Sequence, residues 1–257
     1  VLGRSGGKSM IGVRLHRPER VDDLGLGGLR IIQHPRSFCF SLDAVLLAHF
    51  VRLRLQDQVV DLGAGNGAIS LLLAARGARV VAAVELDKAA ASRAARSIQL
   101  SRRSGQVQVH CGDYRQALPH LPGGIWDVVV ANPPYFQPER GRSSLEKGLA
   151  RQEVTATLAD VLKAARRLVR FRGRVALVHR ADRMVDVLTA MREVNLEPKR
   201  LQLVQPREGA PANLLLIEGV HGGKPGLEVL PPLAVYEADG SYTAQLRACY
   251  EASPAQI

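Results

Sequence analysis

Residues 59–70 read VVDLGAGNGAIS, and this stretch decides the fold. The mostly apolar run at its start is followed by three alternating glycines, Gly63, Gly65 and Gly67. A helical pattern of apolar residues begins at residue 68. Glycine lets the backbone turn tightly and approach a ligand closely, and a helix that starts there leaves its first N–H groups without partners. We therefore interpret the stretch as a strand, a ligand-binding turn and a helix.

The chain around this stretch alternates between strand and helix patterns. Strands are predicted at 58–62, 79–86, 106–110, 126–131 and 173–180, and helices at 68–77, 88–101, 158–170 and 183–194. Two further apolar runs, 199–205 and 213–219, have no helix between them, which indicates an antiparallel pair. Repeated strand–helix units predict an α/β, doubly wound, Rossmann-like sheet of seven strands, mostly parallel with one antiparallel strand.

Both ends of the chain lie outside this repeat. Residues 1–25 lack periodicity and are predicted to be a flexible segment, and residues 26–257 a single domain. Within that domain, 26–55 are expected to form a short hairpin, of strands 29–33 and 37–40, and a helix capped by Ser41. The C-terminal extension, 221–257, is expected to add an extended strand and a short helix.

The composition narrows the class of protein. The net charge of +11 favours a polyanionic partner, nucleic acid first, although a coding bias toward arginine is a competing explanation. No apolar run reaches the length of a membrane span and no signal-peptide core follows the basic N-terminus, so we expect a cytoplasmic protein with no membrane partner. Three widely spaced cysteines predict neither a disulfide framework nor a zinc site, and no metal is expected.

The glycine loop by itself leaves two cofactors open. Gly63-x-Gly65-x-x-Ala68 also satisfies the dinucleotide fingerprint. Asp61 would repel a pyrophosphate but suits a cationic amino acid group, and Asp113 is placed to accept a hydrogen bond from an adenine amine. With Glu85 at the distance where an acid meets a ribose diol, the pattern favours S-adenosyl-L-methionine.

Residues 128–136, VVVANPPYF, end a buried strand in a rigid polar corner. The amine of a nucleobase is a weak nucleophile, and two acceptors placed on its hydrogens would draw it toward tetrahedral geometry. Asn132 offers a side-chain oxygen, Pro133 a carbonyl held by the fixed φ of Pro133 and Pro134, and Tyr135 a face for stacking. The motif leaves open whether the amine is N6 of adenine, N2 of guanine or the amide of a protein glutamine.

Five stretches together resemble one family. They are GLRIIQHPRSFCFSLDAVLLAHF (28–50), VVDLGAGNGAISLLLA (59–74), VVVANPPYF (128–136), ARQEVTATLADVL (150–162) and IEGVHGGKPGLEVLPPLAVY (217–236). The chain from about residue 20 onward is similar to the tRNA1(Val) (adenine-37-N6)-methyltransferases, a family of class I methyltransferases. The resemblance implies S-adenosyl-L-methionine as methyl donor, an anticodon-loop adenosine of tRNA as acceptor, and RNA binding as part of the activity.

Site residues follow from the motifs and from this resemblance. The expected catalytic residues are Asn132, Pro133, Pro134 and Tyr135. The expected cofactor-binding residues are Asp43, Asp61, Gly63, Ala64, Gly65, Asn66, Gly67, Glu85, Leu86, Asp113, Tyr114 and Asn132. Arg140, Arg142 and Arg151 are expected to bind RNA phosphates. A stripe of Lys163, Arg166, Arg167 and Arg170 on the helix 158–170 is either a second RNA contact or a solvated face.

Three other functions remain open at this point. Methylation of a release-factor glutamine or of a guanine N2 in ribosomal RNA would use the same chemistry. A non-catalytic RNA-binding protein on a methyltransferase fold is the alternative from another class. The intact glycine loop, Glu85, Asp113 and Asn132 argue against this last alternative.

Overall fold

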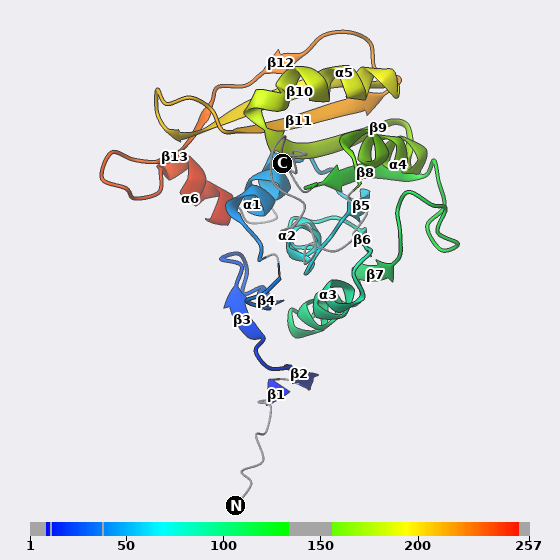
Figure 1. Cartoon of the computed structure of the whole chain (residues 1–257), viewed down its shortest axis with the longest axis vertical. Helices are drawn as coiled ribbons and strands as arrows, with labels where there is room; N and C mark the ends of the chain where they lie inside the picture. The colour runs from blue at the N-terminus through cyan, green and yellow to red at the C-terminus, as the bar shows by residue number, and fades with distance from the viewer. Residues whose placement is uncertain (1–8, 11, 38, 134–155, 252–257) are drawn as a thin grey trace, which may run out of the picture.

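A computed structural model describes residues 9–10, 12–37, 39–133 and 156–251 of the chain. Its centre is one mixed β-sheet with helices on both faces (Figure 1). Among the described residues this sheet has nine strands, in the order β12-β10-β11-β9-β8-β5-β6-β7, with β13 beside β10. The strands are β5 (Gln58–Leu62), β6 (Val80–Glu85), β7 (Val107–Cys111), β8 (Trp126–Ala131), β9 (Val169–Arg180), β10 (Leu196–Arg207), β11 (Leu214–His221), β12 (Glu228–Val229) and β13 (Leu233–Tyr236).

The expected seven-stranded sheet is confirmed in β5 to β11. β5 pairs in parallel with β6 and β8, and the parallel ladder continues to β7 on one side and β9 on the other. β11 runs antiparallel to both β9 and β10. The short strands β12 and β13 extend the β10 edge beyond the predicted seven.

Buried residues alternate between the two faces of the central strands. In β5, Val59 packs into the core on one face and Val60 into the core on the other. The first core holds α1 (Leu42–Phe50) and α2 (Ala68–Ala75), and the second holds α4 (Leu158–Leu168) and α5 (Met184–Glu193). Strands covered on both faces need continuous apolar runs, which is why residues 126–131 and 58–62 could be recognised from sequence.

The expected N-terminal hairpin is wrong in one of its strands. β4 (Arg30–Gln33) pairs with β3 (Arg20–Asp23), before it in the chain, and the described residues 37, 39 and 40 belong to no strand. The other edge of β4 faces α3 (Lys88–Leu100), where the backbone N–H of Ile32 donates to Ser97 Oγ at 2.9 Å. Serine hydroxyls therefore accept hydrogen bonds from the backbone N–H groups of β4 that residues 37–40 were expected to pair with.

Two further observations concern the N-terminus. Within the segment 1–25, residues 20–23 belong to β3, and residues 9–10 and 13–14 form the short strands β1 (Ser9–Met10) and β2 (Val13–Arg14). α1 begins after Ser41 as predicted, but the Ser41 hydroxyl makes no capping hydrogen bond. The division into residues 1–25 and a domain of 26–257 stays a prediction.

The C-terminal extension supplies the expected strand and helix. β13 lies parallel to β10, and α6 (Ala244–Glu251) packs beside α1 (Figure 1). The rings of Tyr236, Tyr242 and Tyr250 stack in sequence with centroid distances of 5.5 and 6.4 Å. The extension is therefore attached to the main sheet and to its first helix.

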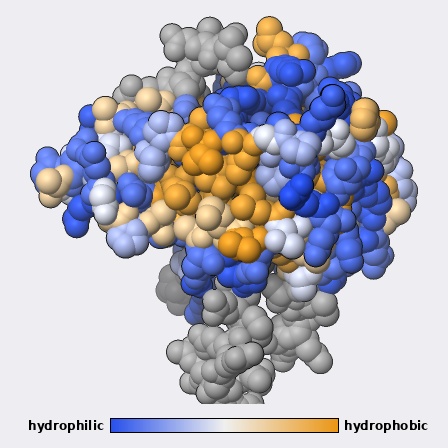
Figure 2. Space-filling view, turned by 90° about the horizontal axis from the view of Figure 1, so that it is seen from above, coloured by the Kyte–Doolittle hydropathy of each residue, from blue (hydrophilic) through white to orange (hydrophobic). Residues whose placement is uncertain are grey.

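The face seen from above carries hydrophobic residues at its centre and hydrophilic ones around them (Figure 2). Among the elements at the top of Figure 1, α5 exposes Val185 and β12 exposes Val229. Both belong to the β10 end of the sheet, away from the glycine loop between β5 and α2. No helix in the described part of the chain combines the length and the apolar character that crossing a membrane requires.

Candidate active site

The carboxyl ends of four neighbouring parallel strands lie at the same end of the sheet, and each strand is followed by predicted site residues. β5 leads into Gly63–Gly67, β6 ends at Glu85 and β7 precedes Asp113. β8 leads into Asn132, which is half-buried, and Pro133, which is buried. In open α/β sheets, ligands bind at the carboxyl ends of the strands. The tertiary structure therefore brings the glycine loop, both acids and the start of the Asn-Pro-Pro-Tyr motif together.

The glycine loop is built so that its first two glycines face open space. Gly63, Gly65 and Gly67 have φ values of 72°, 57° and 90°, which glycine alone adopts without strain. A Cβ at Gly63 or Gly65 would meet no atom within 4 Å, whereas one at Gly67 would lie 3.3 Å from Cβ of Ala94 in α3. The first two glycines leave room for a ligand, and the third lets α3 pack closely.

Glu85 is tied to the loop that it faces. Its Oε2 accepts from the backbone N–H of Gly65 at 2.8 Å, and its Oε1 accepts from the N–H of Asp87 at 2.8 Å. Asp87 in turn caps α3 through Ala90. These bonds orient the carboxylate at the end of β6, and Leu86, which is 49% exposed, adds apolar surface beside it.

Asp61 is fully buried at the end of β5. Its Oδ2 accepts from the Ser70 hydroxyl at 2.6 Å, while Oδ1 has no hydrogen-bond partner among the described residues. Burial raises the pKa of Asp61 to about 7, and the nearby charge of Glu85 also raises it. The side-chain nitrogen of Asn66 in the glycine loop is a second buried polar atom without a partner in the described part of the chain. Unpaired buried polar atoms are costly, so these two favour a polar ligand at the loop.

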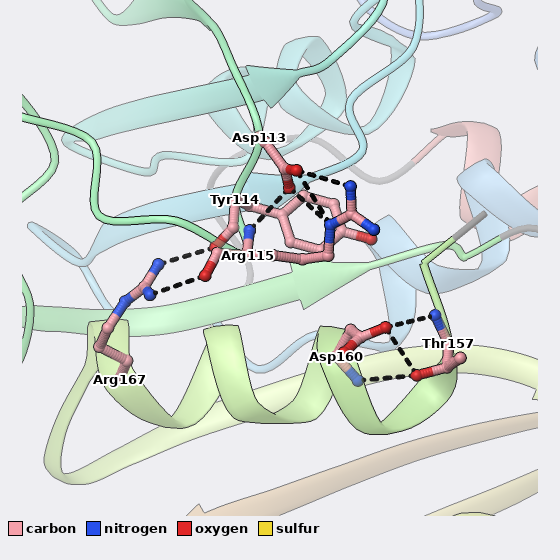
Figure 3. A network of polar contacts seen from close by, with 6 residues as sticks. All are labelled: Asp113, Tyr114, Arg115, Thr157, Asp160 and Arg167. Carbon is pink, nitrogen blue, oxygen red and sulfur yellow. Dashed lines mark hydrogen bonds and ion pairs between the residues drawn. The ribbon is translucent and has the colours of Figure 1, made fainter. Parts of the chain in front are cut away.

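Asp113, which follows β7, forms an ion pair with Arg115. Arg115 donates from Nη2 to its Oδ2 at 2.6 Å and from Nε to both oxygens, and the backbone N–H of Arg115 also donates to it (Figure 3). The hydrogen bond from Arg115 lowers the pKa of Asp113. Burial raises the pKa of the neighbouring Tyr114 to about 12, so its hydroxyl stays protonated. Arg115 was not among the predicted site residues, although its position two residues after Asp113 was a visible signal.

Other predicted residues have mixed outcomes. Asp43 lies in the first turn of α1, and α1 packs on α2, the helix that follows the glycine loop. Pro134, Tyr135, Arg140, Arg142 and Arg151 lie outside the described residues. The predicted helix 158–170 ends at Leu168, so Arg170 belongs to β9 and not to a helical stripe. Arg167 donates to three carbonyls of residues 114–116, and Arg170 pairs with Asp127 at 2.7 Å. Two of the four residues of that predicted stripe therefore make internal contacts.

No cluster of three potential metal ligands occurs among the residues that the structure describes.

Comparison with known proteins gives a consistent picture. The model of the Methyltransferase small domain family matches residues 30–194. A tRNA1(Val) (adenine(37)-N6)-methyltransferase of Serratia proteamaculans is 34% identical over 210 residues, 80% of this chain and 79% of that protein. One of Parabacteroides distasonis is 31% identical over 176 residues, 68% of this chain and 74% of that protein.

Solved structures agree on the fold. The crystal structure of a predicted O-methyltransferase from Agrobacterium tumefaciens superposes with a TM-score of 0.65 at 25% identity, covering 81% of this chain and 95% of that one. A geranyl diphosphate C-methyltransferase of Streptomyces coelicolor, solved with S-adenosyl-L-homocysteine, gives 0.52 at 15% identity over 69% and 76% of the two chains.

The strand order and the ligand loop define a Rossmann-like methyltransferase of the class I type, and the matched model places the chain in the Methyltransferase small domain family. Within that class the chain belongs to the tRNA1(Val) (adenine(37)-N6)-methyltransferase family.

Proposed function

We propose that the protein transfers a methyl group from S-adenosyl-L-methionine to the exocyclic N6 amine of an adenine in tRNA. The names of its relatives point to adenine 37 of tRNA1(Val) as the acceptor. The observation that carries the proposal is the meeting of the glycine loop, Glu85, Asp113 and Asn132 at one edge of the sheet. The relatives do not favour release-factor glutamine or guanine N2 as acceptor.

The residues present fit this cofactor. Gly63 and Gly65 leave space for close approach, and Glu85 can accept from a ribose diol. An amino acid ammonium would satisfy the unpartnered Oδ1 of Asp61, and Asp113 can accept from the adenine amine. Asp43, Ala64, Asn66, Gly67, Leu86, Tyr114 and Asn132 complete the proposed binding residues.

Catalysis in this proposal depends on positioning. When bound, S-adenosyl-L-methionine supplies an electrophilic methyl group on a sulfonium. Asn132 and the carbonyl of Pro133 hold the two hydrogens of the acceptor amine, so that its lone pair points at that methyl group. The nitrogen–methyl bond forms as the sulfur–methyl bond breaks, and the extra proton on nitrogen leaves to water. Pro134 and Tyr135 follow in sequence and are proposed to stiffen the corner and to stack on the base.

RNA binding would use arginines outside the described residues. Arg140, Arg142 and Arg151 follow the catalytic motif in sequence and stay proposed phosphate contacts. An unpaired loop base is cheaper to extrude than a base in a duplex, which suits an acceptor in an anticodon loop. Net charge of +11 supports a polyanionic substrate.

Incubation of the purified protein with S-adenosyl-L-methionine and unmodified tRNA tests the proposal. We expect nucleoside mass spectrometry of the digested RNA to show new N6-methyladenosine, and none when the donor is omitted. New N2-methylguanosine instead would overturn the assignment of the amine. Methylation of a release factor with no methylated nucleoside would overturn the RNA substrate.

The affinity for S-adenosyl-L-methionine should depend on pH through Asp61. Burial raises the pKa of Asp61 to about 7, so the carboxylate that would pair with the ammonium forms only as the pH rises toward that value. The ligand's own α-amino group loses its charge above about pH 8. Isothermal titration should therefore show an affinity that rises up to about tenfold per pH unit below 7 and falls again above 8.

The same shift has a consequence for the unliganded protein. Because the folded-state pKa lies above the unfolded value of 3.8, folding favours protonated Asp61, and this contribution to stability is lost as the pH rises from about 4 through 7. Asp61→Asn should remove both the acid limb of the binding profile and this loss of stability. An affinity that is flat between pH 5.5 and 7.5 in the unmodified protein would contradict the role of Asp61.

A further inference from the structure

Arg167, in the last turn of α4, holds the start of the loop that joins β7 to β8. Its Nη2 donates to the carbonyl oxygens of Tyr114 and Gln116, both at 2.7 Å, and its Nη1 donates to that of Arg115 at 3.2 Å. Figure 3 shows the guanidinium reaching from α4 toward the backbone beside Asp113. One side chain thus satisfies three consecutive carbonyls that belong to no strand or helix.

The same residue also holds the end of this loop. The carbonyl oxygen of Arg167 accepts from the backbone N–H of Gly124 at 2.9 Å. A Cβ at Gly123 would lie only 2.8 Å from that oxygen, so the approach requires glycine at this position. β8 begins two residues after Gly124, and Asn132 follows at its other end. Both ends of the loop 112–125 are therefore fixed to one residue of α4.

Asp113 depends on this loop for its position. It lies one residue before the first carbonyl that Arg167 binds, and its carboxylate is held from the other side by Arg115. The Tyr114 and Leu118 side chains are partly buried against the core that includes α4, and the carbonyls of residues 114–116 bond Arg167 of that helix. A buried helix such as α4, with Val161, Leu162 and Leu168 in the core, is a rigid support for it.

Arginine suits this contact better than lysine. Its planar guanidinium presents several donors in fixed directions over a wide span, whereas a lysine ammonium is a compact charge with its three donors on one atom. Arg167 is exposed on α4, and its guanidinium is oriented by these bonds to the loop.

We propose that Arg167 is a positioning residue for recognition of the cofactor's adenine: by clamping the start of the loop 112–125 through its side chain, it holds the Asp113 carboxylate where the exocyclic amine of the adenine must donate. This inference rests on the proposed function, since it assumes that the cofactor is S-adenosyl-L-methionine. It adds a residue on α4, remote in sequence from Asp113, to the determinants of cofactor selectivity.

The test compares two ligands that differ at the amine. S-adenosyl-L-homocysteine carries it, and its deaminated inosine analogue carries a carbonyl in its place. A site built to accept from an N–H rejects an analogue without one, so the unmodified protein should bind the first more tightly. In Arg167→Met we expect this preference to fall by about tenfold, because the acceptor is no longer held in place.

Three further measurements separate positioning from stability. Lys163→Met removes a positive charge one turn earlier on α4 and should leave the preference unchanged. Arg167→Lys keeps the charge and the stem, is expected to fold, and should lose most of the preference as well. The turnover rate at saturating donor should stay within about threefold of normal in both Arg167 variants, with the loss confined to KM.

The outcomes are distinct. A lower Tm of Arg167→Met and Arg167→Lys with an unchanged ligand preference would show a structural role only and overturn the inference. If the unmodified protein bound neither ligand, the proposed function itself would fail. A preference that is present in the unmodified protein and in Lys163→Met, but lost in both Arg167 variants, would support the inference.

Discussion

Asn132→Ala is expected to reduce the rate of methyl transfer by on the order of 10²–10³, while the affinity for S-adenosyl-L-methionine stays within about threefold. Asn132 follows the last residue of β8, and β8 pairs with β5 and β9 in the middle of the sheet. Its backbone position is therefore rigid, and the alanine variant removes a single acceptor oxygen. The oxygen contributes mainly as the amine becomes tetrahedral, so its loss should appear in kcat and not in donor binding.

Single-turnover methylation of tRNA and calorimetric titration of the donor measure the two effects separately. Asn213→Ala, at an exposed asparagine just before β11, is the matched control and should retain full activity. Asn132→Ala with near-normal turnover would refute the role of Asn132 in holding the amine. Equal losses of turnover and of donor affinity would instead place Asn132 among the residues that bind the cofactor.

Arg174→Met is expected to lower the free energy of unfolding by about 3–5 kcal/mol. Arg174 of β9 pairs with Asp57, which precedes β5, and their side chains are only 10% and 6% exposed. Asp57 also accepts from the backbone N–H of Arg54 at 2.7 Å. Removing the arginine leaves a buried carboxylate without its counter-charge, which costs far more than a lost surface contact.

Urea unfolding monitored by circular dichroism gives the free energy of unfolding from the midpoint and slope. Arg183→Met, which breaks an exposed pair with Asp186, is the control and should cost less than about 1 kcal/mol. The double variant Asp57→Leu with Arg174→Met should recover part of the loss, since no unpaired charge stays buried. If Arg174→Met lowered the free energy of unfolding no more than the control does, the buried pair would not be a main contribution to stability.

The N-terminal hairpin shows the limit of local patterns. Residues 29–33 and 37–40 were predicted to pair because they flank His34-Pro35, whereas β4 pairs with residues 20–23. The other edge of β4 bonds the hydroxyls of Ser97 in α3 and of Ser101 directly after it. A strand edge that pairs with a helix 65 residues away leaves no trace in its own periodicity.

Asp113 and Arg167 show the same limit within the site. Asp113 was identified from its place after a strand, but its ion pair with Arg115 was not. Arg167 was assigned to a stripe on a helix face, either solvated or for RNA, whereas it bonds carbonyls 51 to 53 residues earlier in the chain. Helical spacing places a side chain on a face and does not say which loop crosses that face.

The sequence by itself determined the alternating strands and helices, the ligand loop at Gly63–Gly67 and the corner at Asn132, because each depends on local periodicity or on backbone restrictions of glycine and proline. The tertiary structure alone decided which distant groups meet: the hairpin edge with α3, Asp57 with Arg174, and Arg167 with the loop of Asp113. The physical reason is that such contacts depend on how the sheet orders its strands and helices in space, and a linear pattern carries no record of that order.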